Sequence, residues 1–401
     1  MSENSVNKDA FIEAVKAGDV DQVASLLGRD ENLRAQIDAP WFYFDAPAIV
    51  YSAGNGDRAM VDVLLQNGAD IDIKSSWWAG GVSALNQVTG SMLGYNRELA
   101  EYLIERGATI DVHAAAGLDI PEVLHTLIDE KPHRVNERGP DGMTALHYAA
   151  TPKIAELLLE RGADIEVQDI DHHGTAAQWT VGSRPDVSRY LVERGAKADI
   201  ILCCAIGDVE QTRRLLRTHP DLLEVRVAGE APGGHVYFYT IGRGLNLLEI
   251  ALNFRHLAVT DVLLDMGYQI RLKEWYSIVA QGPKNMDRLV KRFMQHGLDL
   301  NTRQQHRLGF WGPLHYLAHR GLTFGIACLL NNGADPNITD GEGRTPLHLI
   351  ARKGVGKNQV ELLIEGGADV DARDNYGRTL RDYADEAPRD SVARYLAAYR
   401  E

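Results

Sequence analysis

Leucine-rich stretches that end in glycine recur along the chain. Within each stretch the apolar positions repeat at helical spacing, and polar or charged residues occupy the positions between them. Each glycine stands where a helix must end with a positive φ angle, a conformation that costs other residues more. The pattern predicts an amphipathic helix at LLQNGADID (64–72), LIERGATID (103–111), LLLERGADI (157–165), LVERGAKAD (191–199), LLDMGYQI (263–270), FMQHGLDL (293–300), LLNNGADPN (329–337) and LLIEGGADVD (362–371).

A shorter apolar segment precedes several of these helices and predicts a first helix for each repeating unit. In the segment at 343–351, Thr345 suits the N-cap, and Pro346 suits the first helical position, where its missing N–H is not needed. Neither helix can bury its apolar stripe alone, so we expect helix pairs that stack on one another. The first-helix segments are GMTALHYAA (142–150), GPLHYLAHRG (312–321) and GRTPLHLIA (343–351).

These motifs resemble the ankyrin repeat, most closely at Thr-Pro-Leu-His (345–348) and the following GADVDARDNYGRT (367–379). The resemblance extends over nearly the whole chain and implies an all-α ankyrin-repeat solenoid of about 11 to 12 antiparallel helix pairs. The inner helices and loop tips of such a solenoid form the usual binding surface. The resemblance also implies that His147, His315 and His348, at the repeat's own histidine position, tie a loop to a helix.

The repeat pattern predicts one continuous solenoid over residues 1–401, interrupted by one glycine- and aromatic-rich insertion. Helical segments at both ends lack the full repeat motif and are therefore expected to cap the stack. The predicted parts are an N-terminal capping unit (1–38), repeats (39–228), an inserted loop (229–245), further repeats (246–371) and a C-terminal capping unit (372–401).

Several loops are longer than the repeat requires and are rich in aromatic residues. All six tryptophans fall in a loop or a first helix, which in an ankyrin stack lie on the concave side. In extended loops alternate residues share a face, so we expect Tyr237 to lie beside Tyr239, and Trp41 beside Tyr43. The predicted ligand-binding residues are Trp41, Tyr43, Asp45, Trp77, Trp78, Gln178, Trp179, Tyr237, Tyr239, Arg243, Trp275 and Trp311.

The aromatic side chains have two interpretations at this stage. They fill gaps between irregular units, as aromatics in protein cores do, or they line a binding surface in the groove. Convergence on one pocket would favour a small ligand, whereas a spread along the groove would favour a peptide or protein.

Asp171, His172 and His173 are the predicted catalytic residues if the chain is an enzyme. An acid beside an imidazole can tune a general base, although capping or bracing of the loop is the favoured role of the two histidines. The chain has no phosphate-binding glycine loop, no nucleophile elbow and no zinc-like ligand spacing. We therefore expect no cofactor and no metal site, and a hydrolase, lyase or isomerase if there is catalysis.

Charge and cysteine content narrow the classes of partner. The 42 basic and 56 acidic residues give a formal net charge of −14, which argues against nucleic acid and anionic membranes as partners. Three sparse cysteines and the absence of an N-terminal leader pattern predict a cytoplasmic protein. The sequence predicts a protein or peptide partner on the concave, aromatic-lined face. The alternative is a small-molecule or carbohydrate-like ligand in the same groove, with catalysis left open.

Overall fold

The chain forms two compact units in the computed structural model. The structure describes residues 3–90, 95–227, 234–353 and 356–386, together with residues 392 and 395. Unit 1 comprises Met1–Ile206 and Val225–Asn246, and unit 2 comprises Gly207–Glu224 and Leu247–Glu401. The continuity of the two units as one solenoid stays a prediction. Residues 229–233 of the predicted insertion and most of 387–401 in the predicted C-terminal cap lie outside the described residues.

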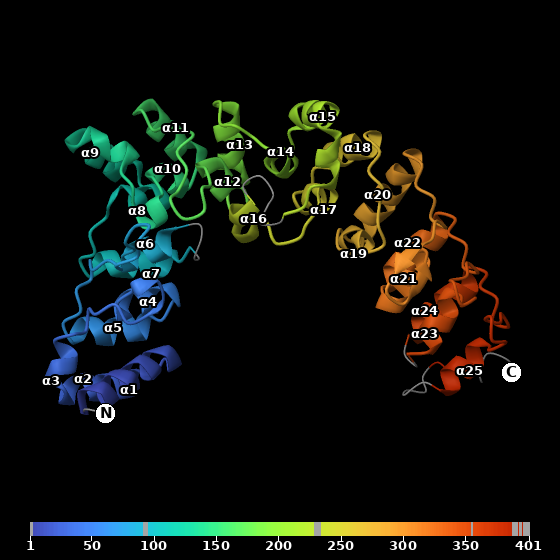
Figure 1. The fold of residues 1–401 in the computed structure, drawn as a ribbon, viewed down its shortest axis with the longest axis horizontal. Coiled ribbons are helices and arrows are strands. Elements are labelled where there is room, and N and C mark those ends of the chain that lie inside the picture. The colour runs from blue at the N-terminus through green and yellow to red at the C-terminus, as the bar shows by residue number, and fades with distance from the viewer. Residues whose placement is uncertain are drawn as a thin grey trace. The chain divides into compact units, whose positions relative to one another are not determined.

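Unit 1 is built of antiparallel helix pairs (Figure 1). The first helices pack side by side from one pair to the next, and an additional helix from the insertion, α16, packs on α12. The helices of unit 1 are α1 (Glu3–Ala17), α2 (Val20–Arg29), α3 (Glu31–Arg34), η1 (Tyr43–Asp45), α4 (Ala48–Gly54), α5 (Arg58–Gln66), α6 (Ala84–Thr89), α7 (Arg97–Glu105), α8 (Val112–Gly117), α9 (Pro121–Glu130), η2 (Pro132–Asn136), η3 (Pro140–Gly142), α10 (Ala145–Tyr148), α11 (Pro152–Glu160), α12 (Ala176–Thr180), α13 (Pro185–Glu193), α14 (Ile200–Ile206) and α16 (Gly234–Thr240).

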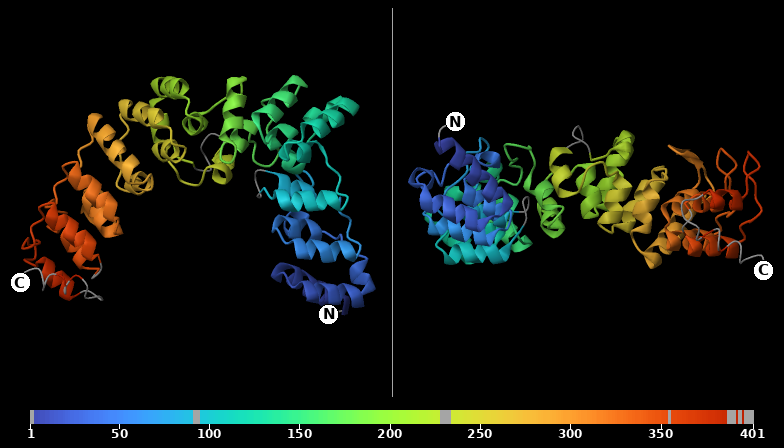
Figure 2. Two further views of the ribbon diagram at one scale, coloured as in Figure 1. Left: turned by 180° about the vertical axis from the view of Figure 1, so that it is seen from behind. Right: turned by 90° about the horizontal axis from the view of Figure 1, so that it is seen from below.

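Unit 2 repeats the same arrangement and adds a short β-hairpin. Its C-terminal pairs stack first helix on first helix and second helix on second helix, and both views of Figure 2 show them (orange to red). The elements of unit 2 are α15 (Val209–Thr218), η4 (Pro220–Glu224), α17 (Leu247–Asn253), α18 (Leu257–Asp265), α19 (Glu274–Val279), α20 (Pro283–Gln295), β1 (Gln304–His306), β2 (Gly309–Trp311), α21 (Pro313–Arg320), α22 (Thr323–Asn331), α23 (Pro346–Ala351), α24 (Lys357–Glu365) and α25 (Leu380–Asp385).

The helix ends follow from local chemistry. The carboxylate of Asp57 caps α5 by accepting a hydrogen bond from the Met60 N–H at 3.0 Å. After the helix, Gly68 adopts a φ of 96°, and the Ala69 N–H then returns to the Leu64 carbonyl at 3.0 Å. The left-handed glycine thus closes the helix where the sequence pattern predicts its end.

The repeat histidines tie each first helix to the loop of the following repeat, which agrees with the predicted tie between loop and helix. In His147, Nδ1 accepts a hydrogen bond from the Thr144 N–H at 3.1 Å, so Nε2 carries the proton and donates to the Gly174 carbonyl at 3.2 Å. Burial holds the pKa of His147 down at about 4, which keeps this tautomer neutral. His315 and His348 make the equivalent pair of bonds in unit 2.

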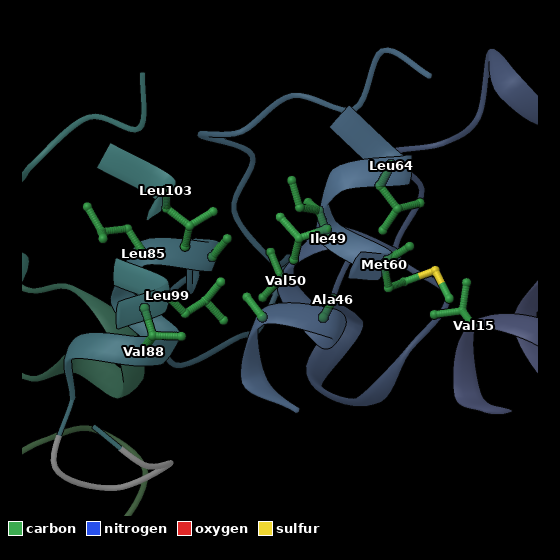
Figure 3. Packing of buried hydrophobic residues seen from close by; sticks show 14 of the residues in the cluster. Val15, Ala46, Ile49, Val50, Met60, Leu64, Leu85, Val88, Leu99 and Leu103 are labelled. Atoms are coloured by element: carbon green, nitrogen blue, oxygen red, sulfur yellow. The ribbon is translucent and has the colours of Figure 1, made fainter. Parts of the chain in front are cut away.

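The core of unit 1 is a continuous apolar layer between stacked pairs. Ile49 and Val50 of α4 meet Met60 and Leu64 of α5, and the same layer continues to Leu85 of the next pair (Figure 3). Because each pair contacts only its neighbours, burial of these side chains requires the stack. The all-α repeat fold predicted from the sequence is therefore confirmed. No helix in the described ranges is long and apolar enough to cross a bilayer.

Two local expectations about the loops are wrong. The described part of the insertion, expected to be a loop, contains the helix α16, in which residues two apart point in different directions. Tyr237 is fully buried while Tyr239 is 62% exposed, so the two tyrosines do not share a face. Trp41 packs on Phe11, whereas Tyr43 contacts Tyr51, because a 3-10 turn begins at Tyr43.

Candidate functional site

A cavity of about 320 Å³ in unit 1 gathers aromatic and acidic side chains from five parts of the sequence. This volume is at the small end of the range of ligand pockets and suits one side chain or a small metabolite. We call it the aromatic–acidic pocket. It is lined by Tyr43, Phe44, Ala46, Val50, Tyr51, Gly54, Asn55, Ser75, Trp77, Val82, Gln87, Asp141, Asp171, His172 and Tyr239.

The first wall of the pocket is the turn before α4. The Phe42 N–H donates to the Ala46 carbonyl at 3.1 Å, which closes a tight turn around Phe44. Phe44 adopts a φ of 60° and is 51% exposed, an unusual conformation for a bulky residue. The ring of Tyr43 lies 6.4 Å from that of Tyr51 on α4. The turn therefore presents two aromatic rings to the pocket instead of burying them.

The second wall is the loop before α6, which carries Trp77. The Ser75 N–H donates to the Val82 carbonyl at 2.9 Å, so the loop is pinched at its base. The indole of Trp77 meets Phe44 edge to face at 5.0 Å. Its buried Nε1 makes no hydrogen bond of regular geometry in the described part of the chain, but it acts on the Asp141 carboxyl and lowers the pKa of that group. Trp78 is 66% exposed beside it, with ring centroids 5.8 Å apart.

Two carboxyl groups reach the pocket from successive loop tips. The Ile170 N–H donates to the backbone carbonyl of Asp141 at 2.8 Å, which places Asp171 close to Asp141. Burial, followed by the negative charge of Asp171, raises the pKa of Asp141 to about 6. Close to neutral pH the pocket therefore holds an acid that changes charge readily.

His172 is held between two carboxylates and two aromatic rings. Its Nδ1 lies 3.7 Å from Asp169 Oδ1 and 3.6 Å from Asp171 Oδ2, and Asp169 is the main reason that the pKa of His172 is raised. The imidazole meets Trp179 and Tyr239 edge to face at 5.4 and 5.0 Å. This arrangement stabilises the protonated form of His172 relative to a free imidazole.

Asp169 holds the same loop in place through hydrogen bonds to its backbone and to Trp179. Its carboxylate accepts hydrogen bonds from Trp179 Nε1 at 2.8 Å, the His172 N–H at 2.6 Å and the Gly174 N–H at 2.7 Å. These donors, together with His172, bring the pKa of Asp169 to about 2 in spite of burial. Asp169 is thus a structural group that is ionised near neutral pH.

The last wall is Tyr239, which the inserted helix α16 supplies. Buried Tyr237 fixes α16 by donating from its hydroxyl to Asp199 Oδ2 at 2.7 Å. Gly182 allows the close approach, because a Cβ there would lie 1.7 Å from the Thr240 carbonyl oxygen. Tyr239 then stacks on Trp179 at 6.2 Å and faces His172. The insertion therefore completes a pocket whose other walls come from the repeats.

Unusual backbone conformations concentrate around this pocket. Six described non-glycine residues have a positive φ, and two of them, Phe44 and Asp141, line the cavity. Asp45 and His173 directly follow lining residues and also have a positive φ. Such conformations persist where the surrounding structure enforces them, and they concentrate at functional sites.

The predicted site residues fall into three groups. Tyr43, Trp77, Asp171, His172 and Tyr239 line the pocket. Asp45, Trp78 and His173 are exposed beside lining residues.

The remaining predicted residues do not reach the cavity. Gln178, Trp179 and Tyr237 lie behind it, where Gln178 donates to Asp199 at 3.0 Å. Arg243 is exposed, with its guanidinium 5.3 Å from the ring of Phe238. Trp41 packs near the N-terminus on Phe11, and Trp275 and Trp311 are buried in unit 2.

The sequence interpretation did not single out Phe44, Tyr51 or Asp141. Phe44 was hidden among its aromatic neighbours, because nothing in the sequence reveals a left-handed turn at a phenylalanine. A signal existed for Asp141, since it lies at a loop tip one repeat before Asp171 and stacked repeats bring successive tips together.

Comparison with known proteins places the chain in a family. The family model described as ankyrin repeats (3 copies) matches residues 94–169, 112–202, 277–374 and 314–401, which together exceed half of the chain. The chain belongs to the ankyrin-repeat family. Ankyrin repeats generally mediate protein–protein interaction.

Several curated proteins share parts of this sequence. An E3 ubiquitin-protein ligase KEG from Arabidopsis thaliana is 32% identical over 75% of this chain and 20% of its own length. The human ankyrin repeat and SOCS box protein 6 is 32% identical over 43% of this chain and 40% of its own length. The bovine cyclin-dependent kinase 4 inhibitor B is 45% identical over 27% of this chain and 80% of its own length. The chain thus spans well under half of the first two relatives.

Proposed function

We propose that this chain is a binding module that holds a protein partner at the aromatic–acidic pocket of unit 1. The observation that carries the proposal is the convergence of Tyr43, Trp77, Asp171, His172 and Tyr239 on one cavity of about 320 Å³. A cavity of this size accepts one side chain of a partner, and buried pockets with aromatic walls are typical of the few residues that dominate binding energy.

The surroundings of the cavity support a protein over a free metabolite as its occupant. Tyr43 and Tyr239, which line the pocket, are 74% and 62% exposed, and Trp78 beside Trp77 is 66% exposed, so these three side chains form an exposed aromatic rim at the cavity. Exposed aromatic side chains grouped in this way are typical of interaction surfaces. One relative, the cyclin-dependent kinase 4 inhibitor B, acts on a protein according to its name, which agrees with a protein partner here.

The test is capture of partners from cell extract with the immobilised full-length chain. The triple variant Tyr43→Ser, Trp78→Ser and Tyr239→Ser removes the exposed rim and leaves buried residues in place. We expect it to lose the proteins that the wild type recovers, by about tenfold or more, because rim and pocket aromatics carry most of such binding energy.

A matched control removes exposed rings of unit 2. Tyr276→Ser, Phe310→Ser and Tyr376→Ser change side chains that are 51%, 42% and 72% exposed. Recovery should stay at the wild-type level in this control. Equal recovery by the rim variant and the wild type would refute the proposal.

A small polar ligand is the second candidate, and the closed grouping of Asp171 and His172 with aromatic rings favours it. Catalysis by Asp171, His172 and His173 belongs to this candidate. A thermal-unfolding screen against metabolites and sugars tests it, because a ligand at about 100 times its Kd adds about 2.7 kcal/mol. A dose-dependent rise in Tm that Tyr239→Ser abolishes would support a small ligand, and no rise across the panel would exclude the compounds tested.

A further inference from the structure

Aspartates at equivalent loop positions are paired with arginine in unit 2. The Asp340 carboxylate binds the Arg344 guanidinium at 2.8 Å, and Asp374 binds Arg378 at 2.9 Å. In both loops the aspartate N–H also donates to the carbonyl of that arginine, at 2.9 Å. The repeat loop of unit 2 therefore neutralises its own acid.

The corresponding loop in unit 1 lacks this arginine. The Asp169 N–H donates to the carbonyl of Gly174 at 3.0 Å, so Gly174 stands at the position of Arg344 and Arg378. A Cβ at Gly174 would lie 2.2 Å from the side chain of Val236, so the inserted helix α16 leaves no room for an arginine. The insertion thus removes a cation from the loop and adds Tyr239 to the pocket wall.

The pocket is left with an excess of negative charge inside aromatic walls. Asp141 and Asp171 both line it, and the charged groups acting on Asp141 are Asp171, Asp169 and His172. His172 is the one basic group among them, and its Nδ1 lies 3.6 Å from Asp171 Oδ2. Three carboxylates around a half-enclosed site are costly unless cations balance their charge, so the pocket can accept a further cation.

We propose that the aromatic–acidic pocket binds a guanidinium, carried by an arginine side chain of the protein partner. This inference rests on the proposed function and names the group that enters the pocket. Asp141 and Asp171 would accept its N–H groups, because a guanidinium matches carboxylates in a planar, charge-assisted geometry. Trp77 and Tyr239 offer ring surfaces for cation–π contact, and Val50 and Val82 offer apolar surface for the alkyl stem.

Binding of this cation depends on the charge state of the pocket. The pKa of Asp141 is about 6, and that of His172 is raised by Asp169 and Asp171. As the pH falls through about 6, Asp141 becomes neutral and no longer attracts a guanidinium, and the raised pKa of His172 favours its positively charged form, which repels one. The affinity should therefore fall as the pH is lowered from 8 to 5, whereas that of an uncharged analogue should stay flat.

The test is titration of the full-length chain with N-acetyl-arginine amide and with the citrulline counterpart, followed by NMR or calorimetry. Citrulline keeps the shape and replaces the guanidinium with a neutral urea. At pH 8 we expect arginine to bind at least about tenfold more tightly than citrulline, which corresponds to about 1.4 kcal/mol. Equal affinities, or no saturable arginine binding, would overturn the inference.

Asp141→Asn is the decisive variant, because asparagine tolerates the left-handed backbone conformation that Asp141 adopts, with φ of 53°. It should lower the affinity for arginine by about tenfold or more and leave citrulline binding unchanged. Asp221→Asn, an exposed position in unit 2, makes the same charge change and should have no effect. An unchanged arginine affinity in Asp141→Asn would also overturn the inference.

The lysine amide separates a guanidinium site from a general cation site. Binding of lysine as tightly as arginine would overturn the choice of a guanidinium. Failure of the arginine experiment combined with rim-dependent partner capture would refute this inference alone. Equal recovery of partner proteins by the rim variant and the wild type would instead refute the proposed function.

Discussion

The two units each gather tryptophan, histidine and tyrosine around an enlarged loop, and the cluster of unit 1 lines a cavity of about 320 Å³. In unit 2, His306 stacks on Trp311 at 4.4 Å, and Trp311 also contacts His319 at 5.0 Å. Trp311 is 1% exposed, and Arg344 binds the Leu308 carbonyl of the hairpin at 3.2 Å. The hairpin therefore covers Trp311, while its own Phe310 stays 42% exposed.

In unit 1 the same residue types remain partly accessible. His172 and Tyr239 pack on Trp179, but Tyr239 stays 62% exposed and faces the carboxylates of the pocket. An aromatic loop in a repeat protein is therefore ambiguous by itself. We expect the rings to fill space where an arginine seals the loop. We expect them to bind a ligand where an acid lies opposite them and no arginine neutralises it.

The largest effect is expected from removing a buried tryptophan of either unit. It tests whether Trp179 of unit 1 and Trp311 of unit 2 contribute equally to stability. Trp179→Ala and Trp311→Ala should each lower the free energy of unfolding by about 3 to 5 kcal/mol, because both remove a fully buried indole. Urea unfolding followed by circular dichroism measures this. Trp78→Ala, at a 66% exposed position, is the control and should change stability by less than about 0.5 kcal/mol. A small effect at Trp179 would mean that this cluster is not a packed support.

The second prediction compares how ionisation of two carboxyl groups of unit 1, Asp141 and Asp169, changes the stability of the fold. The folded-state pKa of Asp141, about 6, lies above its ordinary value, so its ionisation destabilises the fold as the pH rises through 4 to 6. Asp141→Asn should therefore stabilise the protein at pH 7.5 by about 2 kcal/mol, allowing for solvent screening, and have little effect at pH 4.

Ionisation of Asp169 has the opposite effect on stability. Its pKa of about 2 lies below the ordinary value, so its ionisation stabilises the fold above pH 4, and this stability is lost as the pH falls towards 2. Asp169→Asn should cost about 2 kcal/mol at pH 7.5. Urea unfolding at pH 4 and 7.5 measures both variants. Destabilisation by Asp141→Asn at pH 7.5 would remove the distinction between a binding acid and a structural acid.

The smallest effect is expected from two histidines, His319 of unit 2 and His172 of unit 1, whose protonation changes the stability of the fold in acid. Burial, followed by the charge of Lys353, holds the pKa of His319 at about 4, so stability is lost as the pH falls from 6.5 towards 4. His319→Gln should relieve about 1 kcal/mol of this loss after screening is considered. The pKa of His172 is raised, so His172→Gln should instead remove stability that is present below pH 6.5. NMR titration of both imidazoles checks the order, and a higher pKa for His319 would contradict it.

The sequence predicted the repeats well because each repeat carries its own instructions. Leucine spacing and the glycine at 68 act over a few residues, and the structure has the predicted helix end there. The tie from His147 reaches the Gly174 carbonyl of the following repeat, and it was predictable because it belongs to the repeat pattern. Asp171, His172 and Trp77 were selected as loop residues outside the repeat pattern, and they do line one cavity.

The remaining features depend on contacts between distant segments. Tyr237 and Tyr239 were assigned to one face because α16 has no strong helical pattern, and its position depends on Asp199 and on space left by Gly182. The raised pKa of Asp141 depends on the neighbouring loop tip. Local periodicity cannot predict which loops meet or how deeply their side chains become buried.

The origin of Tyr239 outside the repeat period has an evolutionary consequence. Repeat arrays lengthen and shorten by gain or loss of whole repeats, because each contacts only its neighbours. Duplicating the units that carry Trp77 or Asp171 would copy two walls of the pocket without the segment that supplies Tyr239. Duplication of a repeat therefore does not duplicate the pocket. Related proteins that differ in repeat number but keep the insertion should still have a single pocket.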